Sequence, residues 1–434
     1  MTIIFLALIG GLIAASLLYT HSVYNLFTVL AAPYFFLVLL NQFVATPRFG
    51  FFSISDDTLV MLMEGLSAFF VGSILFWKNS QDAGQASFDE KAERYNMRAL
   101  TVFVFVCGTV CFAQSSLVLL RQGVSLDRFE ETTSSLSGGL LSHLKLMALS
   151  VVPITLWHGV RKRSFVALLG TILVFLSVFL SFTKYNIICP VAASIIFVGL
   201  SDERLAKRSL VALLALPIAL FMLNYFVGFY LRNIQANVSG SFYGNHLWTY
   251  LAGSLIYDNY IFTSGIRVGM GAVEKLMTFV FAFPNMFLNK LLGVRFFPHE
   301  KQAFLFVSNT ERSNVVDAIG YLYPSYGNGF DVVEFIVVML FIGLLFSAGV
   351  RIMLRHSADR FNTTLPFFLA EFVLMSFFGT FYINSGPWEQ LIYCAIVPNL
   401  FLNNTMGSET GYFEDSTNSL KPRARYVRRG AKTR

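Results

Sequence analysis

The stretch LVALLALPIALFMLNYFVGFY, Leu210–Tyr230, decides the class of fold, together with a similar stretch, Val332–Val350. Each has close to the roughly 20 apolar residues that a helix needs to cross a hydrocarbon core of ~30 Å. Between them lies Leu231–Asp331, where short apolar runs alternate with aromatic residues, glycines and Lys or Arg. A disordered tether would contain little Phe or Tyr. We therefore expect Leu231–Asp331 to be a folded cap on a membrane protein and to hold its chemistry.

The rest of the chain has the same apolar character. Of 434 residues, 55% are hydrophobic and only 13% are charged, which is unlike soluble domains. A β-barrel would instead alternate apolar and polar residues in short segments. The sequence predicts an all-α polytopic membrane protein of about 11 transmembrane helices, with one large exterior loop between the eighth and the ninth. The expected spans are Ile3–Leu18, Val23–Val44, Leu59–Trp77, Leu100–Leu120, Leu141–Trp157, Phe165–Phe182, Ile187–Leu200, Leu210–Tyr230, Val332–Val350, Leu365–Tyr382 and Trp388–Leu402.

Basic residues predict the orientation. If the spans alternate, Lys and Arg concentrate on one side, in the loops around residues 78–98, 161–163, 201–208 and 351–360 and in the C-terminal tail. Such loops face the cytoplasm, so we expect a cytoplasmic C-terminus and an exterior, or periplasmic, large loop. Most of the net charge of +7 lies in the tail, where it serves as a topology determinant beside anionic lipid; we expect no nucleic-acid partner.

Four parts of the chain follow from these expectations. Residues 1–230 form a transmembrane bundle of about eight helices, residues 231–331 a periplasmic catalytic loop, residues 332–404 the ninth to eleventh helices, and residues 405–434 the basic cytoplasmic tail. Within the loop, the apolar stretch Leu276–Phe297 is interrupted by Pro284, Asn285, Asn289 and Lys290. This pattern favours a pair of half-embedded or interfacial helices over an uninterrupted span.

The arginines of the loop suggest binding of an anionic lipid headgroup. An arginine donates two parallel hydrogen bonds and keeps its charge, which suits a diphosphate. The candidates are Arg232, Arg267, Arg295 and Arg312, joined by Lys184 at the exterior end of a middle span. The alternative for each is to reach towards lipid headgroups or to pair with a local acid.

A general base could come from several loop residues, namely His246, His299, Glu300, Glu311 and Asp317. Sequence alone gives no distance to choose between them. Outside the loop, Glu64 stands in the middle of the third span, where a carboxylate must be paired or face a cavity. We expect it either to close a buried polar contact or to line a headgroup cavity.

The sequence contains none of the common motifs for ATP binding, metal binding or a nucleophilic serine. The chain lacks a Walker A sequence, HExxH, paired CxxC and GxSxG, so we expect no ATP, no metal and no cofactor. Asp56-Asp57 leaves a weak alternative, a divalent ion at an exterior loop. Cys107, Cys111, Cys189 and Cys394 all lie in apolar spans and read as buried hydrophobic residues.

Two stretches of the loop resemble the Wzy-type oligosaccharide repeat-unit polymerases, the O-antigen polymerase family. Tyr250–Tyr260 (YLAGSLIYDNY) is similar to the family's Tyr…Gly…Asp-x-Tyr segment. Ser313–Gly329 (SNVVDAIGYLYPSYGNG) is similar to its Asn-Val…Tyr…Gly-x-x-Gly segment, although Gly327 and Gly329 stand one residue closer together and Asp317 replaces a common Thr. The number of spans, the late exterior loop and the basic tail also resemble this family.

The resemblance implies a GT-C-like enzyme of the bacterial inner membrane. Such an enzyme transfers a glycan from undecaprenyl pyrophosphate to the hydroxyl of a second lipid-linked repeat unit, building O-antigen, capsule or exopolysaccharide. It implies membrane lipids and a chain-length regulator protein as further partners. We expect catalytic roles for Arg295, His299 and Asp317 and substrate contacts from Arg232, Arg267, Arg312, Lys184, Tyr250, Asp258, Asn314, Tyr321 and Tyr323. The alternatives are an O-antigen ligase, a lipid-linked oligosaccharide flippase or other transporter, and a non-catalytic export component.

Overall fold

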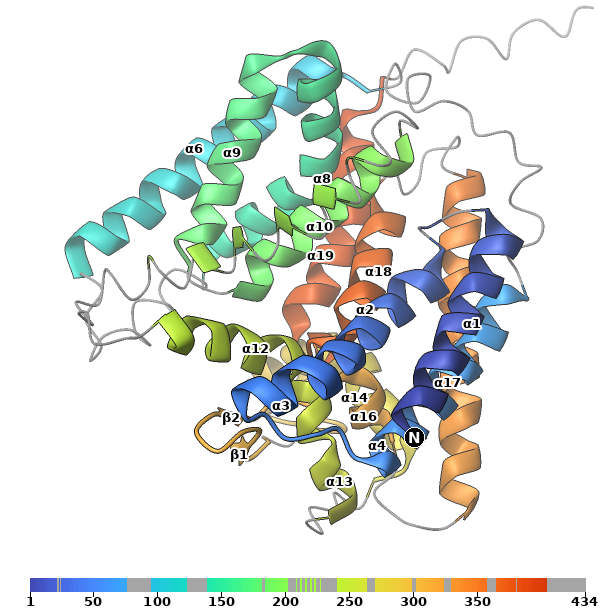
Figure 1. The fold of residues 1–434 in the computed structure, drawn as a ribbon. Coiled ribbons are helices and arrows are strands. Elements are labelled where there is room, and N and C mark those ends of the chain that lie inside the picture. The colour runs from blue at the N-terminus through green and yellow to red at the C-terminus, as the bar shows by residue number, and fades with distance from the viewer. Residues whose placement is uncertain are drawn as a thin grey trace, which may run out of the picture. The chain divides into compact units, whose positions relative to one another are not determined.

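The structure is a computed structural model. It describes residues 1–21, 23, 25–75, 95–122, 139–181, 184–201, 240–263, 270–298, 302–323, 329–356, 364–379 and 381–403, with single positions between 208 and 227. Residues Met1–Leu402 pack together as one unit. Almost all of the regular structure is helical (Figure 1).

Four long helices make up the first helix group: α1 (Thr2–Thr20), α2 (Leu26–Leu40), α4 (Asp56–Ile74) and α17 (Gly329–His356). A π-helical turn, Asn41–Ala45, and the short α3 (Thr46–Phe49) extend α2. Polar caps begin two of these helices, because Asn25 and Ser55 accept hydrogen bonds from N–H groups of α2 and α4. Helices α4 and α17 touch through glycines: a Cβ on Gly72 or Gly343 would collide with a carbonyl oxygen of the other helix.

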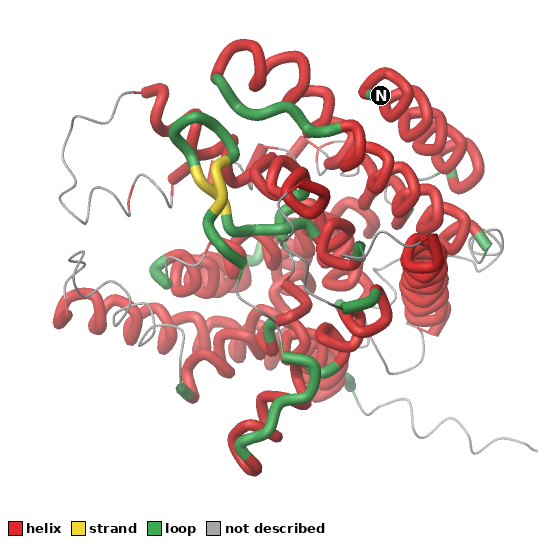
Figure 2. Tube along the Cα trace, turned by 90° about the horizontal axis from the view of Figure 1, so that it is seen from below, coloured by secondary structure: helices red, strands yellow, loops and turns green. Residues whose placement is uncertain are grey.

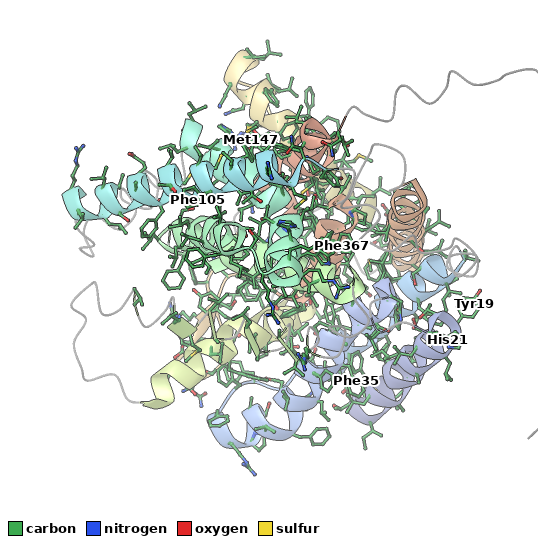
Figure 3. The ribbon with its side chains drawn as sticks, turned by 90° about the horizontal axis from the view of Figure 1, so that it is seen from above. Tyr19, His21, Phe35, Phe105, Met147 and Phe367 are labelled. Carbon is green, nitrogen blue, oxygen red and sulfur yellow. The ribbon has the colours of Figure 1, made fainter. Side chains whose placement is uncertain are left out.

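The second helix group contains α6 (Met97–Gln122), α8 (Leu140–Lys162), α9 (Phe165–Phe179), α10 (Lys184–Ser201) and α19 (Ser385–Ile396), which continues as a 3-10 turn over Val397–Phe401. Helix α18 (Leu365–Leu374) and the turn Met375–Phe377 connect the two groups. Phe367 belongs to the core of the second group, whereas Ala370 and Val373 belong to the core of the first. Figure 3 shows Phe367 near the middle of the molecule, between Met147 and Phe35.

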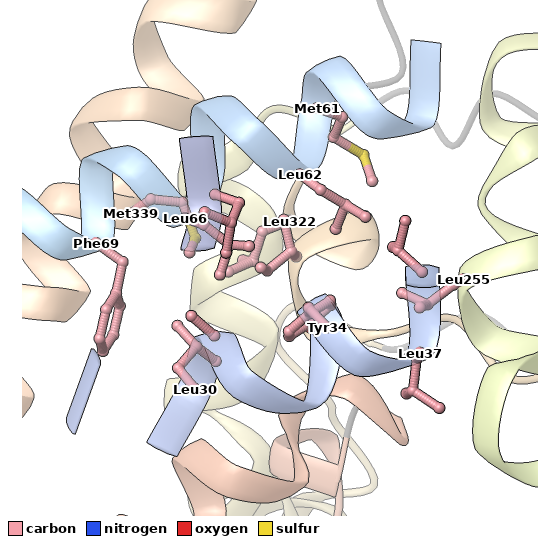
Figure 4. Packing of buried hydrophobic residues seen from close by; sticks show 14 of the residues in the cluster. Leu30, Tyr34, Leu37, Met61, Leu62, Leu66, Phe69, Leu255, Leu322 and Met339 are labelled. Atoms are coloured by element: carbon pink, nitrogen blue, oxygen red, sulfur yellow. The ribbon is translucent and has the colours of Figure 1, made fainter. Parts of the chain in front are cut away.

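The region between α10 and α17 contains α12 (Gly240–Tyr257), α13 (Asn259–Thr263), α14 (Ala272–Val280), α15 (Ala282–Leu292), strands β1 (Leu305–Phe306) and β2 (Arg312–Ser313), and α16 (Ala318–Leu322). The strands form an antiparallel hairpin, with Leu305 opposite Ser313 (Figure 2). Leu255 of α12 and Leu322 of α16 share one buried cluster with Leu62 of α4 and Tyr34 of α2 (Figure 4). This region is therefore folded into the first helix group.

The chain is an all-α membrane protein, as the sequence predicts. In the described part of the chain, six helices are long and apolar enough to cross a membrane: Thr2–Thr20, Leu26–Phe49, Asp56–Ile74, Met97–Arg121, Leu140–Lys162 and Asp331–Val350. Three apolar helices are shorter, Phe165–Phe179, Ile188–Val198 and Leu365–Phe377. The expected span Leu210–Tyr230 is described only at single positions, so the number of spans and the four-part division stay predictions. All four cysteines are buried.

Candidate functional site

Two loop stretches were singled out in the sequence, Tyr250–Tyr260 and Ser313–Gly329, and the described residues of the second, 313–323, lie against the first. Strand β2 packs on α12, where a Cβ on Gly253 would lie 3.4 Å from Ser313. Further along, Gly320 of α16 faces the carboxyl group of Asp258 so closely that any side chain on it would collide with the carboxylate. These contacts bring Asp258 and Asp317 together at one buried point.

Asp317 is the N-cap of α16. Its Oδ1 accepts hydrogen bonds from the backbone N–H groups of Ile319 at 2.7 Å and Gly320 at 2.8 Å. The hydroxyl group of Tyr34, on α2, donates to the same oxygen at 3.2 Å. Both Asp317 and Tyr34 are fully buried. Three donors on one oxygen stabilise the ionised form of Asp317 and attach α16 to a membrane helix.

Asp258 follows the last residue of α12, and its side chain is also fully buried. Among the described residues, no N–H or O–H group donates to either of its carboxyl oxygens or to Oδ2 of Asp317. Buried carboxyl oxygens are costly without a partner. A proton shared between the two carboxyl groups gives a partner to one oxygen of Asp258 and to Oδ2 of Asp317.

The charge of this pair is set by burial. Burial raises the pKa of Asp258 well above its ordinary value, and the negative charge of Asp317 raises it further. Burial also raises the pKa of Asp317, but hydrogen bonds from Asp258, Gly320, Ile319 and Tyr34 act in the opposite direction. Burial and the charge of Asp317 therefore favour a proton on Asp258, and the hydrogen bonds to Asp317 favour the ionised form of that group.

Lys275 lies in the first turn of α14 and is 6% exposed. Its Nζ donates to the carbonyl oxygen of Tyr323 at 2.5 Å and lies 6.0 Å from the centroid of the Tyr321 ring. Burial lowers the pKa of Lys275 to about 8. The hydroxyl groups of Tyr321 and Thr278 are 3.0 Å apart, and the Tyr321 ring stacks on Phe279. Tyr321 and Tyr323, both expected to contact substrate, thus take part in the contact between α14 and α16.

Glu64 of α4 lies close to Tyr323. Burial raises the pKa of Tyr323, and the negative charges of Glu64 and Asp57 raise it further. Oε2 of Glu64 is buried, and no donor to it is found among the residues that the structure describes. Glu64 therefore faces the junction between α4 and the loop.

Polar side chains fasten the end of α12 to neighbouring segments. Tyr257 donates to Oε1 of Gln302 at 3.3 Å, and Tyr260 donates to the carbonyl oxygen of Phe306 at 2.8 Å. Oδ1 of Asn259 accepts a hydrogen bond from the backbone N–H of Ser55 at 2.8 Å, just before α4 begins. The stretch Tyr250–Tyr260 is therefore held at several points around Asp258.

A second titratable pair lies nearer the start of α12. Nδ1 of His246 is 3.6 Å from Oε2 of Glu311, in the turn between β1 and β2. The two side chains are 23% and 16% exposed. Tyr250, one turn further along α12, contacts the His246 ring edge-on and stacks on Phe378. Burial raises the pKa of Glu311.

The two described arginines of the sequence-based site lie on separate elements. Arg295 is exposed just after α15, in a segment fixed by hydrogen bonds between Asn285 and Phe296. Arg312 is exposed on β2, with its guanidinium 4.0 Å from the centroid of the Phe306 ring. Asn314 is half-buried after β2. Arg232, Arg267 and His299, and the side chain of Lys184, lie outside the described residues.

Three residues of the site were not predicted: Tyr34, Lys275 as a buried group, and Gly320. Lys275 is one of the basic residues of Leu231–Asp331, and the sequence does not show that it is buried, because its burial depends on α16. Tyr34 is an ordinary aromatic residue in an apolar span, and no sequence signal indicates its hydrogen bond to a residue of the loop. Aspartate is a favoured N-cap residue, so Asp317 itself did carry a sequence signal for its place at the start of α16.

The helices and this site together define a class: an all-α membrane protein whose long inter-helix region packs into the bundle around a buried carboxyl pair. The model of a family of unknown function (DUF6337) matches residues 50–404, so the chain belongs to this family. The matched region includes Asp258 and Asp317 and begins after Tyr34. Comparisons with curated proteins and with solved structures gave no match.

Proposed function

We propose that the chain is a glycosyltransferase that polymerises oligosaccharide repeat units carried on undecaprenyl pyrophosphate. One observation carries this proposal. The two stretches that resemble the Wzy-type polymerases are far apart in sequence, yet they meet at Asp258 and Gly320 and are fastened to α2 through Tyr34. A site built on packed helices holds its groups more accurately than one on free loops, which is what a transferase requires.

The chemistry of this reaction suits the exposed cations of the loop. The leaving group is a lipid diphosphate, so the main demand is to stabilise its growing negative charge. We infer that Arg295 and Arg312 contribute to this, together with Arg267. Leu291 and Leu292 are 79% and 68% exposed at the end of α15, beside Arg295. A helix with an apolar exposed end and a cation suits the boundary between lipid tails and headgroups, where a lipid diphosphate lies.

We infer the finer topology from the same function. It comprises about 11 transmembrane helices in a GT-C-like arrangement, in a bacterial inner membrane. The loop is periplasmic, with α14 and α15 at the membrane interface, and the basic C-terminus is cytoplasmic. The substrates are two lipid-linked oligosaccharides. A chain-length regulator protein is the further partner that we infer, and no cofactor is needed.

A surface-glycan gel tests the function in the bacterium that encodes the protein. Cells lacking the gene should lose the long ladder and keep single repeat units. Wild type should restore the ladder, Arg295→Ala should not, and Lys290→Ala should, because Lys290 is an exposed cation nearby, on α15, with no assigned role. Equal expression of the three proteins is measured in parallel. Complete loss of attached glycan, with lipid-linked polymer accumulating, would instead identify a ligase.

The buried acid pair favours a second function, that of a proton-coupled transporter. Ionisable residues that share protons and contact membrane helices are typical of transport pathways. Asp258 and Asp317 hold one proton next to Tyr34 of α2. An unchanged ladder in cells lacking the gene, with lipid-linked units retained on the cytoplasmic side, would favour this function over polymerisation.

A further inference from the structure

The reaction proposed above needs a group that takes a proton from the acceptor hydroxyl. Asp317 lies beneath the surface in this structure, so it could reach a substrate only if α16 moved. Among the described residues of the loop, His246 and Glu311 form a titratable pair whose side chains lie close together and are partly exposed. The side chains come from two separate elements, α12 and the β1–β2 turn.

Each member of this pair is fixed by contacts of its own element. On α12, the indole N–H of Trp248 donates to Oδ1 of Asn41 at 3.0 Å, which joins the helix to the π-helical turn after α2. In the hairpin, the carbonyl oxygen of Glu311 accepts from the N–H of Val307 at 2.9 Å, and its own N–H donates to Oγ of Ser308 at 2.9 Å. The pair therefore has little freedom to separate.

The geometry assigns chemically different roles to the two ring nitrogens of His246. Nδ1 faces the Glu311 carboxyl group at 3.6 Å, slightly longer than a hydrogen bond, as is common in sites without substrate. A carboxylate in this position favours the tautomer with its proton on Nδ1. Nε2 then carries the lone pair, which is the form of histidine that accepts a proton.

We propose that His246 is the general base for the acceptor hydroxyl and that Glu311 is its positioning residue; this inference rests on the proposed glycosyltransferase function. The acceptor oxygen forms a bond to the anomeric carbon of the donor while its proton passes to Nε2 of His246. The bond between that carbon and the diphosphate oxygen breaks, and the electron pair leaves with the lipid diphosphate. The imidazolium then releases its proton to water.

The test uses the purified full-length protein in lipid vesicles. Donor and acceptor are the lipid-linked oligosaccharides extracted from cells that lack this gene, and the rate of polymer formation is measured. His246→Asn keeps an amide N–H near the position of Nδ1, facing Glu311, but has no base. We expect its kcat to fall at least ~100-fold with KM and Tm unchanged. Glu311→Gln should lower kcat less, because the ring keeps an acceptor for Nδ1–H.

Two further variants make the test specific. His246→Ala should regain activity when imidazole is added, because the free base can occupy the vacated position. His143→Gln breaks a second histidine–glutamate pair of the described residues, between His143 of α8 and Glu389 of α19, and should keep wild-type kcat. Full activity of His246→Asn in a protein that polymerises would overturn the inference and leave the function intact. The inference would also be overturned if the loss of activity in His246→Asn accompanied a lower Tm, or if imidazole did not restore activity to His246→Ala. Absence of polymer from the wild-type protein would overturn both.

Discussion

Replacing Asp258 by Asn should stabilise the protein at neutral pH, and the gain should grow as the pH rises. In the folded wild type, Asp258 keeps a proton because it is buried beside the charge of Asp317. The unfolded chain releases that proton above the ordinary pKa of about 3.9. Above this pH the folded state therefore binds more protons than the unfolded state, so wild-type stability falls as the pH rises, until the folded pair itself ionises.

The size of the effect follows from this proton count. Each pH unit over which the folded state alone keeps one proton lowers wild-type stability by about 1.4 kcal/mol. The side-chain amide of the Asp258→Asn variant would have no proton to lose, and its N–H can donate to Asp317 in place of the shared proton. Asp317→Asn should act in the opposite direction. The donors Ile319, Gly320 and Tyr34 would then face a neutral oxygen, and losing charge assistance of about 1 kcal/mol per hydrogen bond costs about 3 kcal/mol.

Unfolding by SDS in mixed micelles, followed by tryptophan fluorescence between pH 5 and pH 8, measures these differences. Groups elsewhere titrate equally in wild type and variant, so the difference between them isolates the pair. A difference between Asp258→Asn and wild type that does not change with pH would refute the shared proton. So would a variant that is less stable than wild type throughout, or equal effects of the two Asn substitutions.

Two other predictions concern the same region. Lys275 should contribute up to about 3 kcal/mol of added stability between pH 8 and pH 10.5, because it releases its proton near pH 8 when folded and near 10.5 when unfolded. The stability of wild type relative to Lys275→Met, unfolded in the same micelles, should rise by this amount, since the Asp258–Asp317 pair titrates equally in both proteins. Gly320→Ala should lower stability by roughly 1–3 kcal/mol because its Cβ collides with Asp258, whereas Gly244→Ala on α12, where the new Cβ meets nothing within 4 Å, should leave it unchanged or raise it. A stable Gly320→Ala protein with wild-type Tm would contradict the close contact.

Much of the fold could be predicted because a membrane imposes a simple rule on composition. The spans Ile3–Leu18 and Val332–Val350, expected from hydropathy alone, lie within the apolar helical stretches Thr2–Thr20 and Asp331–Val350 of the structure. The break between α14 and α15 was also expected within Leu276–Phe297, although it falls at Phe281, ahead of Pro284. Proline is accommodated there because it lies in the first turn of α15, where its missing N–H has no helical partner.

The site was harder to predict because its contacts join residues far apart in sequence. Asp258 and Asp317 were both singled out, yet each was given a separate role, since nothing in the sequence shows that they share a proton. Tyr34 was missed because a tyrosine inside an apolar span is an ordinary packing residue until a partner is known. His246 and Glu311 were two of several equivalent base candidates, and only the hairpin turn brings them together.

The position of the two titratable pairs along α12 allows their roles to be separated. His246 and Asp258 are twelve positions apart in sequence, which is about 18 Å along a helix. The Asp258–Asp317 pair is buried and hydrogen-bonded to Tyr34 of α2, so its protonation changes the stability of the packing between the loop and α2. The His246–Glu311 pair is partly exposed, so its protonation can act on a bound substrate. A substitution at Asp258 should therefore change the pH dependence of stability, and one at His246 should not, because losing a partly exposed base removes little buried charge.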